Sequence, residues 1–420
     1  MASSSVLFDI APRTFKMAGM LELEAALEQI LACIRPLPAE TIPLSKAAGR
    51  VLAGSVTSPV PVPLFDNSAM DGYAVLARDV AAARAEVPVK LLRCGEVAAG
   101  GMFSGNVEPG TCVRIFTGSP LPNGADAVVM QEDTRIDPGQ PDLVWVLDGV
   151  KPWENIRLRG EDLKPGATLG ARGDVIDIGR LALFAATGFK EVCAARQPLL
   201  GVLATGSELL EAAEPVAPGK FFESNRILLA ALLERAGALP RVFPLVKDTL
   251  SATRAALEQA FQVCDSVVTT GGVSVGELDF VKSAFEQLGG RIEFWKVSIR
   301  PGKPFVFGRL GEKFLFGLPG NPVSALVTFL LLVRPAIRRW QGAGDVTLPS
   351  HPGRLAEPLA NAADRRHFMR VRVDPEGQVR SAGTQASHIL SALAAAQGLV
   401  DVPPRTTLAA GSGVKVLRWD

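Results

Sequence analysis

The feature that most constrains the fold is an alternation of short apolar runs with helix-type segments between residues 197 and 340. The runs LLGVLA, VFPLV and SVVTT are each followed by a segment in which apolar residues recur at helical spacing. Strands that alternate with helices of this length form a parallel sheet with right-handed crossovers. Such sheets bind ligands beyond the carboxyl ends of their strands. The segment therefore predicts an α/β domain with a parallel-rich sheet and a ligand site on one rim.

Acidic residues follow three successive strand ends of this predicted sheet. Glu208 lies in TGSEL, Asp248 in VKDT and Asp279 in TTGGVSVGELD. Carboxylates repel a phosphate unless a divalent cation lies between them, and Mg²⁺ prefers carboxylate, phosphate and water oxygens. The three acids therefore predict a magnesium site that handles a phosphate ester. The alternative for Asp279 is a helix cap, because Ser274 and Glu277 have the spacing of a capping box.

Glycines at two of these strand ends indicate close approach of the ligand to the backbone. Gly271 and Gly272 follow the buried run SVVTT, and Thr205-Gly206 closes LLGVLA. Backbone N–H groups at such turns can cradle a phosphate. We therefore assign Thr205, Gly206, Gly271, Gly272 and Ser274 to ligand binding.

A basic stretch, FWKVSIRPGKPFVFG, follows the acidic loop. It carries Lys296, Arg300 and Lys303 around Pro301-Gly302. If residues 296–300 are extended, the first two cations project from one face and suit an oxyanion or polyphosphate. The alternative is a solvated strand edge protected by charge.

The stretch GLPGNPVSALVTF resembles the start of a helix after a strand. Asn321 stands at the N-cap position and Pro322 at the first helical position, which a purely structural cap explains. The free N–H groups and the hydroxyl of Ser324 could also hold a small dianion.

Composition along the chain predicts separate β domains around the α/β domain. Residues 52–146 are rich in proline, glycine and short β-type runs, and residues 367–383 predict a hairpin. The predicted parts are a flexible N-terminus over 1–18, a helical and extended linking domain over 19–51 and 147–192, a small β domain over 52–146, the α/β domain over 193–342 and a C-terminal β domain over 343–420.

Charge and residue counts exclude several classes of protein. A net charge of +1 argues against a general binder of nucleic acid or membrane surfaces. The longest apolar run, residues 323–333, is shorter than the ~20 residues that span a bilayer, so we expect a buried helix. Five widely spaced cysteines without a CxxC pair indicate reduced thiols in a cytoplasmic protein. Three scattered histidines argue against a zinc site.

Taken together, the motifs resemble the molybdopterin molybdenumtransferase family, which is related to the E domain of gephyrin. The matching stretches are PLFDNSAMDGYAV, VRIFTGSPLPNGADAVVMQED, ENIRLRGEDLKPG, LATGSEL, TTGGVSVGELDFVK, FWKVSIRPGKPFVFG and FGLPGNPVSA, in the family's order. The resemblance implies an enzyme that inserts molybdate into adenylated molybdopterin, with Mg²⁺, and releases AMP. It also implies an elongated homodimer in which the partner's β domain completes the active site.

The resemblance assigns catalytic roles to residues of the α/β domain. Glu208, Asp248 and Asp279 match the acids expected to hold magnesium and handle the phosphates. Lys296 matches a basic residue near the pterin phosphate or the molybdate. Arg300 stands where the family often has lysine, so its charge is kept while its geometry differs.

The resemblance extends to the β domains. Asp66 and Thr117 match positions expected to reach the neighbouring subunit's site. Ser324 and Arg370 lie in stretches that resemble oxyanion contacts, and Ser387 matches a site of the C-terminal domain.

Two alternative functions share part of this pattern. The enzyme that adenylates molybdopterin uses a similar α/β domain but lacks the N-terminal helical and β domains. A non-catalytic scaffold, as the gephyrin E domain is for receptor loops, has no need of three rim acids and a basic strand. The adenylating enzyme and the molybdoenzymes that accept the cofactor are the protein partners that the resemblance suggests.

Overall fold

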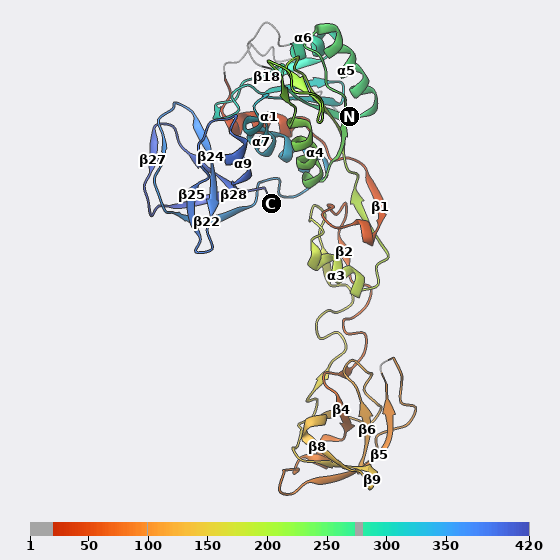
Figure 1. Ribbon diagram of the computed structural model, residues 1–420. Helices are drawn as coiled ribbons and strands as arrows, with labels where there is room; N and C mark the ends of the chain where they lie inside the picture. Colours follow the sequence, from red (N-terminus) through yellow and green to blue (C-terminus); the bar gives the residue numbers. More distant parts are fainter. Residues whose placement is uncertain (1–19, 99, 274–279, 420) are drawn as a thin grey trace, which may run out of the picture.

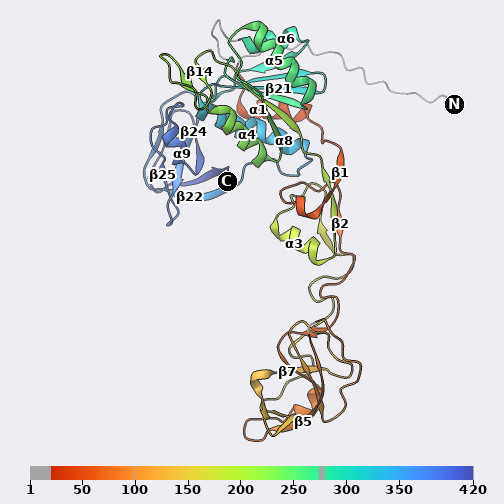
Figure 2. The same ribbon diagram turned by 45° about the vertical axis from the view of Figure 1, so that its right-hand side comes forward.

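The computed structural model describes residues 20–98, 100–273 and 280–419. The chain is elongated, as Figures 1 and 2 show. An α/β part and a C-terminal β part lie side by side at one end, a small linking part follows, and a β lobe lies at the far end. The multidomain α/β-plus-β fold is thus confirmed, while the domain borders stay predictions. The segment 1–18 lies outside the described residues.

The α/β part is built on a six-stranded mixed sheet. In spatial order its strands are β16 (Leu239–Val242), β13 (Leu199–Ala204), β17 (Ser266–Thr270), β21 (Lys313–Leu318), β20 (Val306–Leu310) and β18 (Arg291–Trp295). The first four run parallel and the last two antiparallel to their neighbours. Its central strands β13, β17 and β21 are buried along almost their whole length, because both faces of a sheet of this kind are covered.

Helices cover both faces of this sheet, which gives it two cores. Alternate residues of one strand enter opposite cores, as Val267 and Val268 of β17 do. One face packs against α1 (Leu23–Cys33), α4 (Asn225–Ala236), α7 (Pro322–Thr328), the π-helical η3 (Phe329–Val333) and α8 (Arg334–Trp340). The other packs against α5 (Leu250–Val263) and α6 (Phe280–Gln287).

Two local expectations differ from the structure. The second strand lies at Leu239–Val242, so most of VFPLV follows the strand and only Val246 rejoins the sheet, by a bridge to Thr205. The apolar run 323–333 is buried along its whole length, as expected, but its second half is π-helical. No helix in the described part of the chain is long and apolar enough to cross a bilayer.

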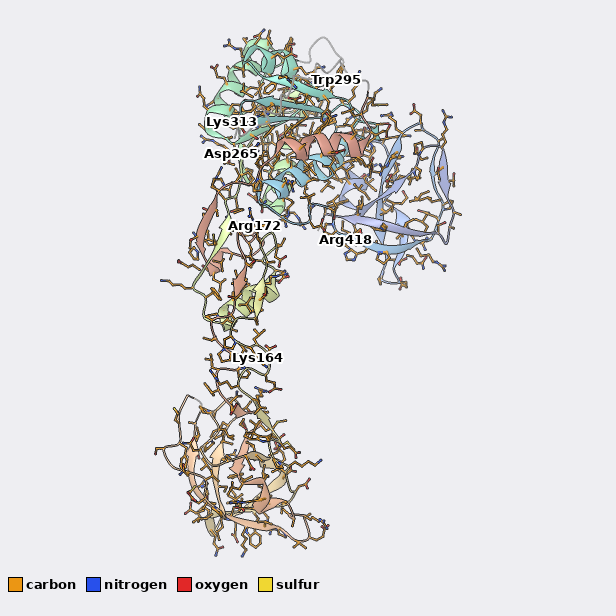
Figure 3. All side chains as sticks on the ribbon, turned by 180° about the vertical axis from the view of Figure 1, so that it is seen from behind. Lys164, Arg172, Asp265, Trp295, Lys313 and Arg418 are labelled. Carbon is orange, nitrogen blue, oxygen red and sulfur yellow. The ribbon has the colours of Figure 1, made fainter. Side chains whose placement is uncertain are left out.

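The linking part connects the α/β part to the distal lobe. The chain passes through it twice, and the outgoing strands pair with the returning ones. These pairs are β1 (Ala39–Pro43) with β12 (Glu191–Ala195) and β2 (Val56–Thr57) with β11 (Thr168–Gly170), beside α3 (Ile178–Ala186). Lys164 lies in the narrow connection below them (Figure 3). A bridge between Val62 and Leu163 keeps the two segments together.

The distal lobe and the C-terminal part each carry one six-stranded sheet. The lobe's strands, in order, are β7 (Ala127–Met130), β4 (Gly72–Val75), β6 (Thr111–Ile115), β5 (Val89–Val97), β9 (Gln140–Val146) and β8 (Thr134–Asp137). The C-terminal strands are β19 (Ile299–Arg300), β24 (Arg366–Val373), β25 (Gln378–Ser381), β22 (Ser350–Leu355), β28 (Gly413–Arg418) and β26 (Gly398–Val402). Because β19 follows the α/β strand β18 in the chain, it fixes the C-terminal part beside the α/β part.

Candidate active site

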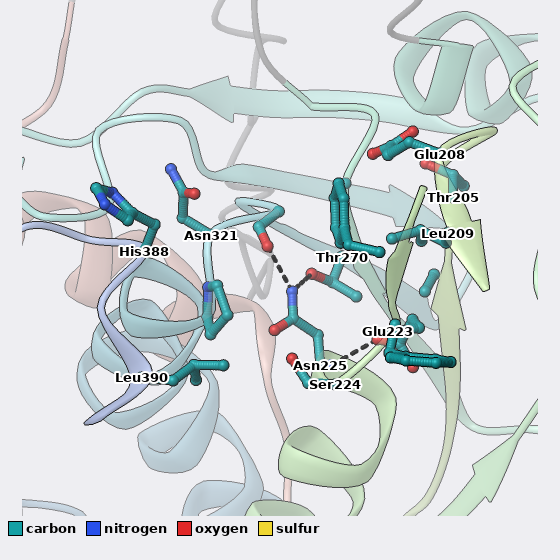
Figure 4. Close-up of a pocket in the computed structure, with 16 residues that line it drawn as sticks. Thr205, Glu208, Leu209, Glu223, Ser224, Asn225, Thr270, Asn321, His388 and Leu390 are labelled. Carbon is teal, nitrogen blue, oxygen red and sulfur yellow. Dashed lines mark hydrogen bonds between the residues drawn. The ribbon is translucent and has the colours of Figure 1, made fainter. Parts of the chain in front are cut away.

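A cavity of about 640 Å³ opens at the carboxyl ends of β13, β17 and β21 (Figure 4). We call it the strand-end cavity. The residues that line it are Ala204, Thr205, Glu208, Leu209, Phe221, Phe222, Glu223, Ser224, Asn225, Thr270, Gly271, Gly320, Asn321, Pro322, His388 and Leu390. It lies where parallel-sheet topology predicts a ligand site.

A second cavity, of about 400 Å³, adjoins the first, and we call it the basic hollow. It is lined by Arg300, Pro301, Gly302, Lys303, Pro304, Pro319, Asn321, Ser324, Arg365, Gln385, Ala386, Ser387 and His388. Asn321 and His388 line both cavities, so the two are neighbours. The basic hollow has three cationic side chains, whereas the strand-end cavity has apolar and acidic ones. A ligand with an anionic end and an uncharged end fits such a pair.

The glycine turn after β17 accepts no larger residue. Gly271 and Gly272 have φ values of +83° and +64°. A Cβ on Gly271 would lie 2.4 Å from the carbonyl oxygen of Thr205, and one on Gly272 would lie 2.7 Å from its Oγ1. The turn therefore packs directly against Thr205, at the wall of the cavity. The N–H of the neighbouring Gly206 donates to the carbonyl of Val246 at 3.2 Å.

The predicted acids are in part brought together. Glu208 lines the strand-end cavity. The carboxylate of Asp248 accepts a hydrogen bond from the N–H of Ser207 at 2.7 Å, which ties the loop after β16 to the loop that carries Glu208. Asp279 and Ser274 lie outside the described residues. Within the described ranges no group of three His, Cys, Asp or Glu side chains is arranged to hold a metal.

Residues 296–300 do not form one extended run, so the condition for a shared face of Lys296 and Arg300 is not met. Strand β18 ends at Trp295, and Lys296 has a left-handed φ of +84°. Its Nζ lies 3.8 Å from the centre of the Trp295 ring, which Lys282 also approaches, at 3.5 Å. Trp295 lies at the α/β end of the molecule (Figure 3). Lys296 therefore does not line the basic hollow with Arg300, because the chain turns between them.

The residues of the GNPVS turn lie on the wall between the cavities. Asn321 stands at the N-cap position of α7, but its side chain makes no capping hydrogen bond there. Capping therefore does not account for this side chain, which lines both cavities. Ser324 is buried, and both Ser324 and Ser387 line the basic hollow. The carbonyl of Ser387 accepts a hydrogen bond from the N–H of Val323 at 3.3 Å.

Arg370 is not an oxyanion contact in this structure. Its side chain is 1% exposed. Its guanidinium donates to the carbonyls of Thr384, Ala386 and Ile389 at 2.6, 3.1 and 3.2 Å. Burial lowers the pKa of this guanidinium. Arg370 instead holds the backbone of the loop that carries Ser387 and His388 to the basic hollow.

Asp66 and Thr117 lie between Val62 and Leu163 in the chain and so belong to the distal lobe. The lobe, with strand β6 just before Thr117, lies at the opposite end of the molecule from the α/β part (Figure 1). The carboxylate of Asp66 accepts from the N–H of Arg159 at 2.6 Å. The hydroxyl of Thr117 donates to Asp71 at 2.8 Å. One chain alone therefore does not bring them to the α/β site.

Three family models together match most of the chain. They are the MoeA N-terminal region (domain I and II) over residues 21–188, a probable molybdopterin binding domain over 201–339 and the MoeA C-terminal region (domain IV) over 352–419. Molybdopterin molybdenumtransferase 2 of Mycobacterium tuberculosis is 38% identical over 411 residues, which cover 96% of this chain and 100% of the relative. This chain belongs to the molybdopterin molybdenumtransferase (MoeA) family.

Other members of the molybdenumtransferase family support the assignment. The molybdopterin molybdenumtransferase of Haemophilus influenzae is 39% identical over 380 residues, 89% of this chain and 92% of that one. The crystal structure of the molybdopterin biosynthesis moeA protein from Pyrococcus horikoshii OT3 matches with a TM-score of 0.78 and 30% identity. It covers 95% of this chain and 100% of that chain. The likeness therefore includes all four parts of the fold.

Several cavity residues of this family member were missed from its sequence. Asn225 comes just before the apolar run ILLAALL and looks like an ordinary helix start. Arg365 and His388 lie in segments without a motif. His367, which lines neither cavity, was missed as well. It is 3% exposed, and neither ring nitrogen has a hydrogen-bond partner among the described residues. Burial, then the charges of Arg300 and other nearby arginines, lower the pKa of His367 to about 4.

Proposed function

We propose that this protein inserts molybdate into adenylated molybdopterin, in a magnesium-dependent reaction that releases AMP. The observation that carries the proposal is the junction of the strand-end cavity and the basic hollow at Asn321 and His388. Family membership supplies the reaction class, and the paired cavities suit a substrate with an uncharged ring and several negative charges.

The basic hollow lowers the electrostatic cost of the reaction. Molybdate and the pyrophosphate-linked nucleotide are both anionic, so they repel each other. Arg300, Lys303 and Arg365 offset that repulsion from one side of the junction. Arginine also offers a planar pair of donors that suits tetrahedral oxyanions. We assign the oxyanion end of the substrates to this hollow.

Glu208 and Asp248 are the described residues that would hold Mg²⁺, together with Asp279 from outside the described ranges. Carboxylate oxygens are the donors that this ion prefers. Bound magnesium supplies charge neutralisation at the phosphate oxygens while the phosphoanhydride is cleaved. The glycine turn is not a ready phosphate cradle, because the N–H of Gly271 already donates to the carbonyl of Leu318 at 3.2 Å.

We also propose that the site is shared between two chains. Asp66 and Thr117 belong to the distal lobe, which lies away from the α/β part of its own chain. In a homodimer the lobe of one chain would lie over the cavities of the other. Expressing a Glu208→Gln chain together with a Thr117→Ala chain tests this, because mixed dimers regain one intact site only if the sites are shared.

The decisive experiment is an assay of AMP release. Purified protein is mixed with adenylated molybdopterin, Mg²⁺ and molybdate, and AMP is measured with and without molybdate. We expect release that needs both ions, and loss of release in Glu208→Gln but not in Glu258→Gln, an exposed residue of α5. Consumption of unadenylated molybdopterin and ATP would favour the adenylyltransferase instead. No reaction with either substrate would favour the scaffold.

A further inference from the structure

The side-chain amide of Asn225 is held in one orientation. Its Nδ2 donates to the carbonyl of Gly320 at 2.6 Å and to Oγ1 of Thr270 at 2.8 Å (Figure 4). A carbonyl can only accept a hydrogen bond, and the Thr270 hydroxyl already donates its own proton to the carbonyl of Pro319 at 3.1 Å. Both neighbours therefore require the nitrogen of the amide, so the assignment of Nδ2 and Oδ1 is fixed.

The amide oxygen is left without a donor. Asn225 is 7% exposed, and its Oδ1 accepts no hydrogen bond from any described residue. The hydroxyl of Thr205, on the same cavity wall and 6% exposed, is likewise without a partner in the described part of the chain. Buried polar atoms are nearly always paired, so two unpaired ones in one cavity point to a ligand.

The backbone around Asn225 is rigid. It is the first residue of α4, and its N–H donates to Oε1 of Glu223 at 2.5 Å. The same carboxylate is paired with Nε of Arg226 at 2.9 Å and is itself buried. With the backbone anchored in this way and Nδ2 bonded to Gly320 and Thr270, the amide oxygen has no donor among the described residues.

The rest of the wall favours a flat, uncharged ring. Leu209, Phe221, Phe222 and Leu390 line the same cavity. The two phenylalanines are 57% and 47% exposed, which leaves their aromatic surface available to a ligand. Aromatic side chains of this kind stack on heterocyclic bases.

We infer that Asn225 is a specificity-determining residue that accepts a hydrogen bond from an N–H group of the substrate's fused heterocycle. The strand-end cavity then holds the ring while the basic hollow holds the anionic end. The inference rests on the proposed function, whose substrate carries two such rings. Pterin and adenine share the required chemistry, a fused pyrimidine with an exocyclic amino group.

The test removes the amino group from the ligand and the acceptor from the protein. Two pairs of ligands are compared, and each pair differs only in the amino group. One pair is AMP and purine ribonucleoside 5′-monophosphate, and the other is pterin and its analogue without the 2-amino group. The dissociation constant of each ligand is measured with wild type and with Asn225→Ala. For one pair we expect wild type to prefer the amino form by roughly 3- to 10-fold, and the variant to lose that preference. The pair that responds identifies the ring.

Gln341→Ala is the matched control. Gln341 is also a buried amide that donates to a carbonyl, that of Ala236 at 2.9 Å, and its Oε1 is also unpaired in the described chain, but it does not line the cavity. Its substitution should leave the ligand preference unchanged. If Asn225→Ala does not fold, Thr270→Val releases one of the two anchors and should weaken the preference.

Equal affinities within both ligand pairs for wild type would overturn the inference, and so would a preference that survives in Asn225→Ala. These measurements need neither molybdate nor turnover. A wild-type enzyme that releases AMP but shows no amino preference would therefore reject the role of Asn225 alone. A protein that shows the preference but no AMP release would reject the proposed function alone.

Discussion

Ser207 and Asp248 hold each other through two reciprocal hydrogen bonds. The N–H of Ser207 donates to Oδ2 of Asp248 at 2.7 Å, and the N–H of Asp248 donates to Oγ of Ser207 at 3.2 Å. The loop after β16 is thereby fixed to the loop that carries Glu208. Asp248 consequently has a structural role in addition to the magnesium-binding role proposed for it.

Two substitutions separate the roles of Asp248. Asp248→Asn keeps an oxygen for Ser207 but removes the charge, so we expect normal thermal unfolding and AMP release lowered by about 10²-fold. Asp248→Ala should lose activity and also unfold at lower temperature. Normal turnover by Asp248→Asn would leave Asp248 with the structural role only. Activity and thermal unfolding measured on the same preparations decide between these results.

Gly271→Ala should disrupt the wall of the strand-end cavity. The new Cβ would lie 2.4 Å from the carbonyl oxygen of Thr205, at a φ of +83°. We expect a loss of at least about 2 kcal/mol in the free energy of unfolding, together with loss of activity. Gly289→Ala is the control, because Gly289 has a φ of +84° but open space around it. It should cost only about 1 kcal/mol and leave AMP release intact.

Arg370→Ala should loosen the loop over the basic hollow. The carbonyls of Thr384, Ala386 and Ile389 lose their buried donor, which costs on the order of 3 kcal/mol in the free energy of unfolding. Amide hydrogen exchange over residues 384–389 should become faster, and molybdate binding weaker. Arg370→Lys should fall between wild type and alanine. Unchanged exchange over this loop would show that other contacts hold it.

The stability of the protein should fall in mild acid because of His367. Its folded pKa, about 4, lies below its ordinary value of 6.5, so the unfolded chain takes up a proton that the folded protein resists. The contribution of neutral His367 to the free energy of unfolding is complete above pH 6.5, and it is lost as the pH falls towards about 4. That interval corresponds to roughly 3 kcal/mol.

His367→Phe should remove this acid sensitivity. Neither ring nitrogen has a partner among the described residues, so the variant should lie within about 1.5 kcal/mol of wild type at neutral pH. Denaturant unfolding of both proteins at pH 7 and pH 4.5 measures the difference. Equal losses in the two proteins would assign the acid sensitivity to other groups.

The sequence predicted the architecture of the site better than the orientation of its side chains. Strand periodicity and the turn glycines are local signals, so the sheet, the rim and the turn at Gly271 could be located. The buried helix over 323–333 follows from its composition in the same way. Parallel topology then placed Thr205, Glu208 and Gly271 at one cavity.

The remaining features depend on contacts between distant segments. The left-handed turn at Lys296 has no local signal, since lysine rarely adopts that conformation. Arg370 looks like an anion-binding residue until the loop over 384–389 folds onto it. Asn225 looks like a helix start until Gly320 and Thr270 take both of its amide protons.

The bridge between Val62 and Leu163 makes the distal lobe an insertion with adjoining ends. A short turn that spliced these two residues together would remove the lobe without opening either core of the α/β part. The shortened protein would keep both cavities. It would show directly which steps of the reaction the severed lobe serves.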